Sequence, residues 1–384
     1  MPMKTLPGRR YRLETDPALV ADVRTRVAAA RFPTQQAGAD WATGTPLSYM
    51  QRLREYWLHD FDWTSWATRI NRFTQRMVEV DGETVHVLIE PGSGADPIPL
   101  VMTPGWPGSF IEFIDIIDTL AHPERHGGSA EQAFTVIIPS LPGYGLSPAP
   151  AKPLEPRDIA RLWSRLMTDS FGVDRYLAYG SDWGSLVTAT LAFEFPERLA
   201  GIMLTASGGT PDFASGAPIA AEEQAWLDGF RTAMEGEAGY QAIQGTKPQT
   251  LAYAQTDSPI GLAAWIVEKF QSWTVPGTQD DPPFSMDILL ANIMLYWING
   301  SLAPSWLYMF LDKARGPRQG RAKVPAVFMI PPHDLFPPVP RCSLERSYDV
   351  VDYTLAGRGH FPGMDSPATL VAELRRMLLP LARR

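Results

Sequence analysis

Residues 176–185 read Tyr-Leu-Ala-Tyr-Gly-Ser-Asp-Trp-Gly-Ser, with an aspartate near the centre of the stretch. The spacing Gly180-Ser181-Asp182-Trp183-Gly184 is typical of a tight, strained turn that joins a strand to a helix and presents a nucleophile at its apex. Because the backbone is crowded there, the residues two positions before and after the nucleophile must be small. Asp182 has glycine at both positions. We therefore predict that Asp182 is a nucleophile on a strand-to-helix turn.

The two serines of this stretch do not meet the same requirement. Ser181 would have Tyr179 and Trp183 at the flanking positions. Ser185 would have Trp183 and Val187 there. A carboxylate nucleophile attacks carbon by displacement and forms an ester with the protein. The pattern therefore disfavours serine lipases and peptidases and indicates an enzyme that opens epoxides or removes halides.

The composition is that of an ordinary soluble globular chain. Its 384 residues are 45% hydrophobic and 20% charged, enough for a large core and more than one subdomain. A net charge of −8 argues against a nucleic-acid partner, which needs concentrated positive charge. The single cysteine, Cys342, excludes an internal disulfide and a multi-cysteine metal site, and we interpret it as structural. We expect a cytoplasmic protein without a membrane anchor, since neither a signal peptide nor a long apolar run is visible.

Short apolar segments alternate with helical segments through much of the chain. This alternation predicts an α/β fold with a mostly parallel sheet. Asp81-Gly82, between two alternating apolar runs, predicts a hairpin over residues 77–89. The other expected strands are 99–103, 134–139, 176–180, 199–204, 324–329 and 349–354.

Two regions show helical periodicity without convincing strands. Residues 1–75 are rich in aromatic side chains and are expected to form an N-terminal helical region. Residues 208–317 interrupt the strand pattern, which predicts a helical lid over the edge of the sheet where ligands bind. The α/β core would then consist of residues 76–207 and 318–384, with a last helix from Pro367 to Leu379 that Pro380 stops.

An ester on Asp182 must be hydrolysed, so a base must activate water. In the α/β-hydrolase order the nucleophile comes first, then an acid, then a histidine. His360, in a loop after the last expected strand, fits the base. His333 also follows the nucleophile but leaves no acid before it. The remaining histidines precede Asp182: His59, His86, His122 and His126.

The acid that orients the base should follow the strand at 324–329. Asp334 is the best placed carboxylate. The competing carboxylates are Glu345, Asp349 and Asp352.

An oxyanion hole in this fold uses two backbone N–H groups. One belongs to the residue after the nucleophile, here Trp183. The other comes from the loop after an earlier strand, where Pro104-Gly105-Trp106 offers the Trp106 amide. Gly105 would let the backbone approach closely.

Motifs spread over nearly the whole chain make it similar to one family. The chain resembles the microsomal-type epoxide hydrolases, and among them the soluble bacterial members. The similarity rests on the turn at 180–184 and on 61–63, 69–73, 239–240, 244–250, 257–265 and 292–297.

The resemblance implies Asp182 as nucleophile, Asp334 as acid and His360 as base. It also implies two lid tyrosines that hold and protonate the epoxide oxygen. Tyr240 matches the first without a gap. Tyr308 matches the second after a one-residue shift, which leaves Tyr296 as a rival. The family usually has histidine where this chain has Pro104, and this change bears on the geometry of the Gly-Trp-Pro-Gly turn.

The sequence therefore predicts an epoxide hydrolase that converts a hydrophobic epoxide and water to a vicinal diol, with no cofactor and no metal. A dehalogenase with the same aspartate, and an inactive ligand-binding relative, are the alternatives. A homodimer is left open. The expected substrate pocket is aromatic and draws on Trp106, Trp183, Phe336 and Phe361, with Trp265, Trp273 and Trp297 as further candidates.

Overall fold

The computed structural model describes residues 6–38, 40–206, 208–209, 213, 216–316 and 320–382. Their strands form one nine-stranded sheet in the order β1-β2-β3-β5-β4-β6-β7-β8-β9. The strands are β1 (Arg9–Tyr11), β2 (Thr74–Val80), β3 (Glu83–Glu90), β4 (Ile98–Thr103), β5 (Phe134–Pro139), β6 (Tyr176–Gly180), β7 (Leu199–Leu204), β8 (Ala322–Ile330) and β9 (Tyr348–Leu355).

The sheet is parallel from β5 to β9 and antiparallel at the end formed by β1, β2 and β3. The predicted hairpin is confirmed: Val80 pairs with Glu83, and Asp81 and Gly82 have φ values of 52° and 83°. These positive values suit a two-residue hairpin turn. Strand β1 was missed, because its three residues carry no apolar pattern and are held by pairing with β2.

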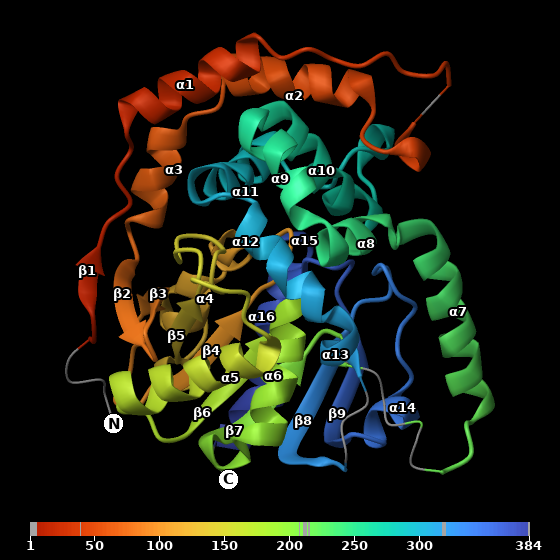
Figure 1. The fold of residues 1–384 in the computed structure, drawn as a ribbon. Coiled ribbons are helices and arrows are strands. Elements are labelled where there is room, and N and C mark those ends of the chain that lie inside the picture. Colours follow the sequence, from red (N-terminus) through yellow and green to blue (C-terminus); the bar gives the residue numbers. More distant parts are fainter. Residues whose placement is uncertain are drawn as a thin grey trace.

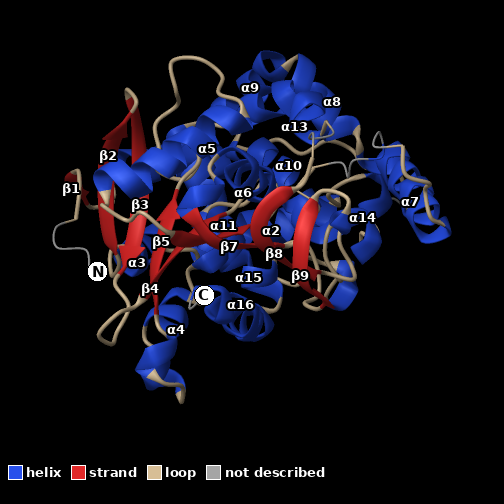
Figure 2. Cartoon of the chain, turned by 90° about the horizontal axis from the view of Figure 1, so that it is seen from below, coloured by secondary structure: helices blue, strands red, loops and turns tan. Residues whose placement is uncertain are grey.

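Helices cover both faces of the sheet (Figure 2). On one face lie α5 (Pro156–Arg165) and α6 (Trp183–Glu194), and on the other α4 (Ile117–Ala121) and α16 (Pro367–Ala382). Every residue of β5, β6 and β7 is therefore buried. This explains why these strands read as continuous apolar runs rather than as alternating ones.

The prediction that Pro380 stops the last helix after Leu379 is wrong. Helix α16 continues to Ala382 with Pro380 inside it. Leu379 and Leu381 on either side of the proline are buried, and Leu381 packs against the backbone of Gly201, where a Cβ would lie 2.5 Å from its Cδ1. This burial offsets the hydrogen bond that proline cannot donate.

The expected lid follows β7 and lies over one edge of the sheet, and the N-terminal helices arch over the lid (Figure 1). No strand occurs among the described residues of 208–315. The lid helices are α7 (Ala221–Glu237), α8 (Gly239–Thr246), α9 (Pro248–Asp257), α10 (Pro259–Ser272), α11 (Met286–Asn299), α12 (Leu302–Ser305), the 3-10 helix η9 (Trp306–Phe310) and α13 (Leu311–Arg315). The N-terminal helices are α1 (Pro17–Ala28), α2 (Leu47–His59) and α3 (Trp63–Ile70), which contact α10 and α11.

Two short helices, α14 (Arg341–Glu345) and α15 (Pro362–Asp365), follow β8 and β9. Within the described ranges, no single helix has the length and apolarity needed to cross a membrane. Helix α11 passes such a test only when joined to residues 302–315, from which it is bent by 96°.

Candidate active site

Asp182 sits at the apex of the turn between β6 and α6, with φ 49° and ψ −124°. This conformation is rare for a residue with a side chain. The flanking glycines are required by close backbone contacts: a Cβ on Gly180 would lie 2.2 Å from the Gly184 carbonyl oxygen. A Cβ on Gly184 would lie 1.8 Å from the Thr103 carbonyl oxygen. The crowding explains the glycine spacing seen in the sequence.

The neighbouring serines have other partners. The Ser185 hydroxyl donates to the Gly180 carbonyl at 2.8 Å. The Ser181 hydroxyl lies 3.2 Å from both carboxyl oxygens of Glu112. Both serines are 1% exposed. Of the three side chains considered in this stretch, the carboxylate of Asp182 is the one that faces His360.

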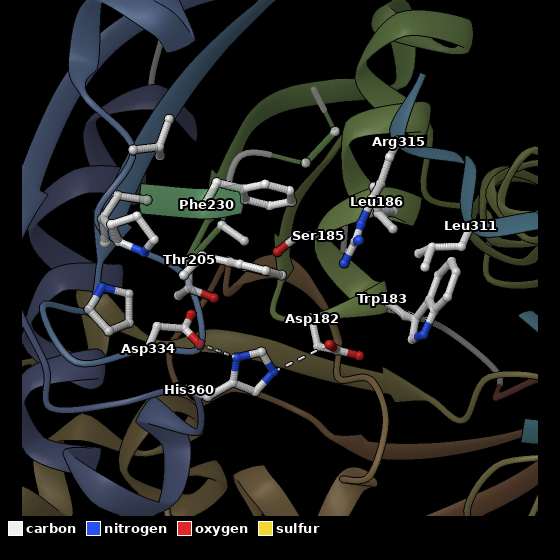
Figure 3. A pocket seen from close by; sticks show the side chains of 18 of the residues that line it. Asp182, Trp183, Ser185, Leu186, Thr205, Phe230, Leu311, Arg315, Asp334 and His360 are labelled. Carbon is white, nitrogen blue, oxygen red and sulfur yellow. Dashed lines mark hydrogen bonds and ion pairs between the residues drawn. The ribbon is translucent and has the colours of Figure 1, made fainter. Parts of the chain in front are cut away.

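Three residues that follow different strands meet beside the cavity (Figure 3). Asp182 follows β6, Asp334 follows β8, and His360 follows β9. His360 Nδ1 lies 2.6 Å from Asp334 Oδ1, and its Nε2 lies 3.3 Å from Asp182 Oδ2. His360 is only 7% exposed. Because parallel strands end at one edge of the sheet, residues far apart in the chain come together here.

Two opposed effects act on the imidazole. Burial lowers the pKa of His360, but the charges and hydrogen bonds of Asp334 and Asp182 outweigh it and hold this pKa well above its usual value. The carboxylates that competed with Asp334 lie elsewhere: Glu345 ends α14, and Asp349 and Asp352 lie on β9. The cation formed on His360 is therefore stabilised by two carboxylates at once.

One carboxyl oxygen of Asp182 is held by backbone. The Trp106 N–H donates to Asp182 Oδ1 at 2.7 Å. A Cβ on Gly105 would lie 2.0 Å from the same oxygen and 2.5 Å from the Trp183 nitrogen. The Trp106 N–H thus binds Oδ1, the Trp183 nitrogen borders the same Gly105 position, and Asp182 itself directly precedes α6.

The two tyrosines implied by the resemblance lie side by side over the aspartate. Tyr240 and Tyr308 are 5% and 4% exposed, with ring centroids 5.6 Å apart. Both line the cavity that contains Asp182 and His360. Tyr296 does not line it, and its hydroxyl donates to the Gly108 carbonyl at 2.8 Å.

The phenols of the cavity are held in their protonated form. Burial raises the pKa of Tyr240, and the charge of Asp182 adds to the effect. Burial also raises the pKa of Tyr308, with Tyr240 and Asp182 as further causes. Both hydroxyls are therefore hydrogen-bond donors at neutral pH.

The cavity is largely apolar, and the aromatic residues on its wall differ from those expected. Trp183 and Phe336 line it, whereas Trp106 and Phe361 do not. The Trp106 ring stacks behind Tyr240 at 5.1 Å, and Phe361 stacks on Phe270 at 4.2 Å. Trp265, Trp273 and Trp297 also lie off the wall. Sequence reasoning missed the apolar lining residues Leu186, Trp226, Leu227, Phe230, Leu311 and Val339.

A few polar groups interrupt this wall. Ser185 and Thr205 line it, and Arg315 points into it from the lid. Across the part of the chain that the structure describes, no group of three or more His, Cys, Asp or Glu side chains is arranged to hold a metal ion.

Glu112 is a buried acid that sequence reasoning did not single out. It lies beneath the Asp182 turn, is 3% exposed, and contacts Ser181. Burial raises the pKa of Glu112 to about 8. The only sequence signal is a single acid within the apolar run Phe110-Ile111-Glu112-Phe113.

Fold and site together define an α/β hydrolase with a carboxylate at the nucleophile position. Family models agree: residues 8–113 match "Epoxide hydrolase N terminus", and residues 98–254 match "alpha/beta hydrolase fold". The chain is 36% identical to a Stigmatella aurantiaca protein named "Putative epoxide hydrolase", over 95% of this chain and 83% of the relative. It is 31% identical to "Epoxide hydrolase 1" of Oryctolagus cuniculus, over 95% and 87%. The chain belongs to the microsomal-type epoxide hydrolase family.

Solved structures show the same architecture. The epoxide hydrolase of Aspergillus niger is similar with a TM-score of 0.83 and 27% identity, covering 100% of this chain and 97% of that one. The juvenile hormone epoxide hydrolase of Bombyx mori gives a TM-score of 0.86 at 24% identity, covering 100% and 99%. The second likeness is evidence for the fold alone.

Proposed function

We propose that this protein hydrolyses a hydrophobic epoxide to a vicinal diol through an ester on Asp182. The observation that supports this most directly is that one cavity holds a carboxylate, a histidine–carboxylate pair and two phenol donors. Epoxide opening needs the carboxylate and the phenol donors, and ester hydrolysis needs the histidine–carboxylate pair. The partners are a small-molecule epoxide and water. A cytoplasmic location stays a prediction from the sequence, and the oligomeric state stays open.

In the first half-reaction the oxygen of Asp182 that faces His360, Oδ2, attacks an epoxide carbon. The carbon–oxygen bond of the ring breaks, and its electron pair goes to the epoxide oxygen. Tyr240 and Tyr308 hold this oxygen, and one of them gives it a proton. Acid assistance of this kind contributes roughly 10²–10⁴ in rate. Asp182 Oδ1, held by the Trp106 N–H, becomes the carbonyl oxygen of the ester.

In the second half-reaction water attacks the ester carbonyl while His360 takes its proton. Esterification has removed the Asp182 charge, so one of the two carboxylates that raise the pKa of His360 is gone. The imidazole can then act as a base, with Asp334 fixing its orientation. Negative charge gathers on Oδ1 beside the two N–H groups, each worth roughly 10²–10³ in rate.

The tetrahedral intermediate collapses when the carbon–oxygen bond to the diol breaks. The diol oxygen takes the proton from His360, and the new carboxylic acid loses its own proton, which restores the phenol. The two phenols favour an epoxide over a halide, because a departing alkoxide needs a proton and a halide does not. Measuring diol formation and halide release on matched substrates distinguishes the two activities.

The ester is tested by mass spectrometry. His360→Ala mixed with styrene oxide should accumulate an adduct on the peptide that contains Asp182, since attack proceeds and hydrolysis stops. His59→Ala, an exposed histidine on α2, serves as the control and should turn over normally. In ¹⁸O-water, a single turnover of the unmodified enzyme should label the Asp182 carboxylate. An unmodified Asp182 in both experiments would overturn the mechanism.

A further inference from the structure

The two cavity tyrosines have different hydrogen-bond partners. The Gln241 Nε2 group donates to the Tyr240 hydroxyl oxygen at 2.9 Å. Oε1 of the same amide accepts from Arg315 Nη1 at 3.2 Å. These two contacts form a series of hydrogen bonds that runs from Arg315 through Gln241 to Tyr240. Tyr308 has a side-chain hydrogen bond with Trp183, a neutral donor, and a further hydrogen bond joins Tyr308 to Tyr240 and partly offsets the rise that burial causes in the pKa of Tyr240.

The direction of these hydrogen bonds matters for proton transfer. Gln241 occupies a lone pair of the Tyr240 oxygen, so the phenol proton stays free to point at a substrate. When that proton leaves, the phenolate charge falls on an oxygen that already accepts an N–H bond. Gln241 is 7% exposed, and hydrogen bonds to a developing charge are stronger in such a site than in water.

Arg315 supplies the positive charge at the far end of this series of hydrogen bonds. It lines the cavity on α13, and its guanidinium lies over the rings of Phe336 and Phe230, at 5.4 and 6.0 Å. Within the described ranges no carboxylate lies within ion-pair distance of it. Lys269, the other cation near Tyr240, lies 4.8 Å from the ring but is paired with Glu237 and Glu268.

We propose that Arg315 and Gln241 are positioning residues that make Tyr240, and not Tyr308, the proton donor to the epoxide oxygen. Tyr308 then holds the oxygen through a hydrogen bond without giving up its proton. The inference rests on the proposed function. In balanced form, the epoxide carbon–oxygen bond breaks, its electron pair goes to oxygen, and the Tyr240 proton follows. The phenolate left behind faces Gln241 until the proton released by ester hydrolysis restores it.

The test separates the two half-reactions by rapid-quench measurement of the ester on styrene oxide. Gln241→Leu and Arg315→Met should each slow ester formation about tenfold, the effect of about one pKa unit on the donor. Ester hydrolysis should change less than about twofold, because Tyr240 has already given its proton. Arg315→Lys, which keeps the charge, should recover most of the rate. Arg231→Met, an exposed arginine on α7, is the matched control.

A double-mutant cycle decides whether the effect runs through Tyr240. Arg315→Met should have no further effect in a Tyr240→Phe background and should keep its full effect in a Tyr308→Phe background. The inference is overturned if the loss persists without the Tyr240 hydroxyl, or if both half-reactions slow equally. It is also overturned if the loss is confined to epoxides that carry a carboxylate, which would make Arg315 a substrate-binding group.

Failure of the proposed function gives a different result, because the unmodified enzyme would then form no ester at all. Thermal melting of each variant shows whether it is folded. Should Arg315→Met unfold, Gln241→Leu carries the same comparison in the Tyr240→Phe and Tyr308→Phe backgrounds.

Discussion

The two walls of the cavity are built in different ways. On the sheet side, Asp182, Asp334 and His360 each follow a parallel strand, and backbone contacts position the Asp182 carboxylate directly. On the lid side, Tyr240, Tyr308 and Arg315 lie on α8, η9 and α13, short elements that pack on one another. Under the proposed mechanism, attack and ester hydrolysis depend on backbone geometry. Proton donation and substrate choice would instead depend on which faces of the lid helices pack inward.

The largest expected effect is on the sheet side. Asp182→Ala should lower kcat for diol formation by roughly 10⁴–10⁶, because no other group can form the ester. Thermal melting should show a folded protein. Asp349→Ala, an exposed carboxylate on β9, is the control. Diol formation within tenfold of the unmodified enzyme would show that the sheet-side wall does not carry the nucleophile.

The next effect tests whether backbone positions the nucleophile. Gly105→Ala would place a Cβ 2.0 Å from Asp182 Oδ1, so the Trp106 loop must move and its N–H bond is lost. We expect kcat to fall by roughly 10²–10³. Gly236→Ala, in the open on α7, should leave kcat unchanged and stabilise the helix by about 0.5–1 kcal/mol. Equal kinetics for the two variants would contradict the comparison.

On the lid side, a hydroxyl that faces the cavity should matter more than one that does not. Tyr308→Phe should slow ester formation about 10²-fold, since one of two donors to the epoxide oxygen is lost. Tyr296→Phe should cost about 1 kcal/mol of stability through the bond to Gly108, with little change in rate. Single-turnover kinetics and denaturant unfolding measure both. A larger kinetic loss in Tyr296→Phe would reverse the assignment.

The last effect is on stability rather than on rate, and it concerns the acid beneath the sheet-side wall. The pKa of Glu112 is about 8 in the folded protein and 4.5 as its ordinary value, so folding favours the protonated acid. Between these pH values the unfolded chain releases the proton and the folded one keeps it, so stability falls as pH rises. Glu112→Gln should remove this slope and be more stable above pH 8 by a few kcal/mol, on the order implied by the shift.

Urea unfolding at low and high pH measures the slope for Glu112→Gln. Glu235→Gln, an exposed glutamate on α7, is the control and should keep the slope of the unmodified protein. If Glu112→Gln also keeps the slope of stability against pH, Glu112 is ionised in the folded state, and burial does not raise its pKa.

The sheet and its hairpin could be predicted because buried parallel strands leave apolar runs and because Asp81-Gly82 is a turn signal of short range. Strand β1 could not, since pairing with β2 alone makes it a strand. Pro380 shows the same limit: a local rule against proline in helices gave way to burial of its neighbours. The sequence predicted that the residues at the strand ends would meet. It did not predict which side chains would line the cavity wall.

By itself, the sequence determined the features that depend on short-range backbone sterics. The glycines around Asp182 and the strands that precede Asp182, Asp334 and His360 are of this kind. Only the tertiary structure decided that Phe230 faces the cavity while Phe361 turns toward Phe270, and that Gln241 links Arg315 to Tyr240. Helical periodicity tells which side chains share a face but not what that face meets, because the crossing of lid helices is settled by packing over the whole domain.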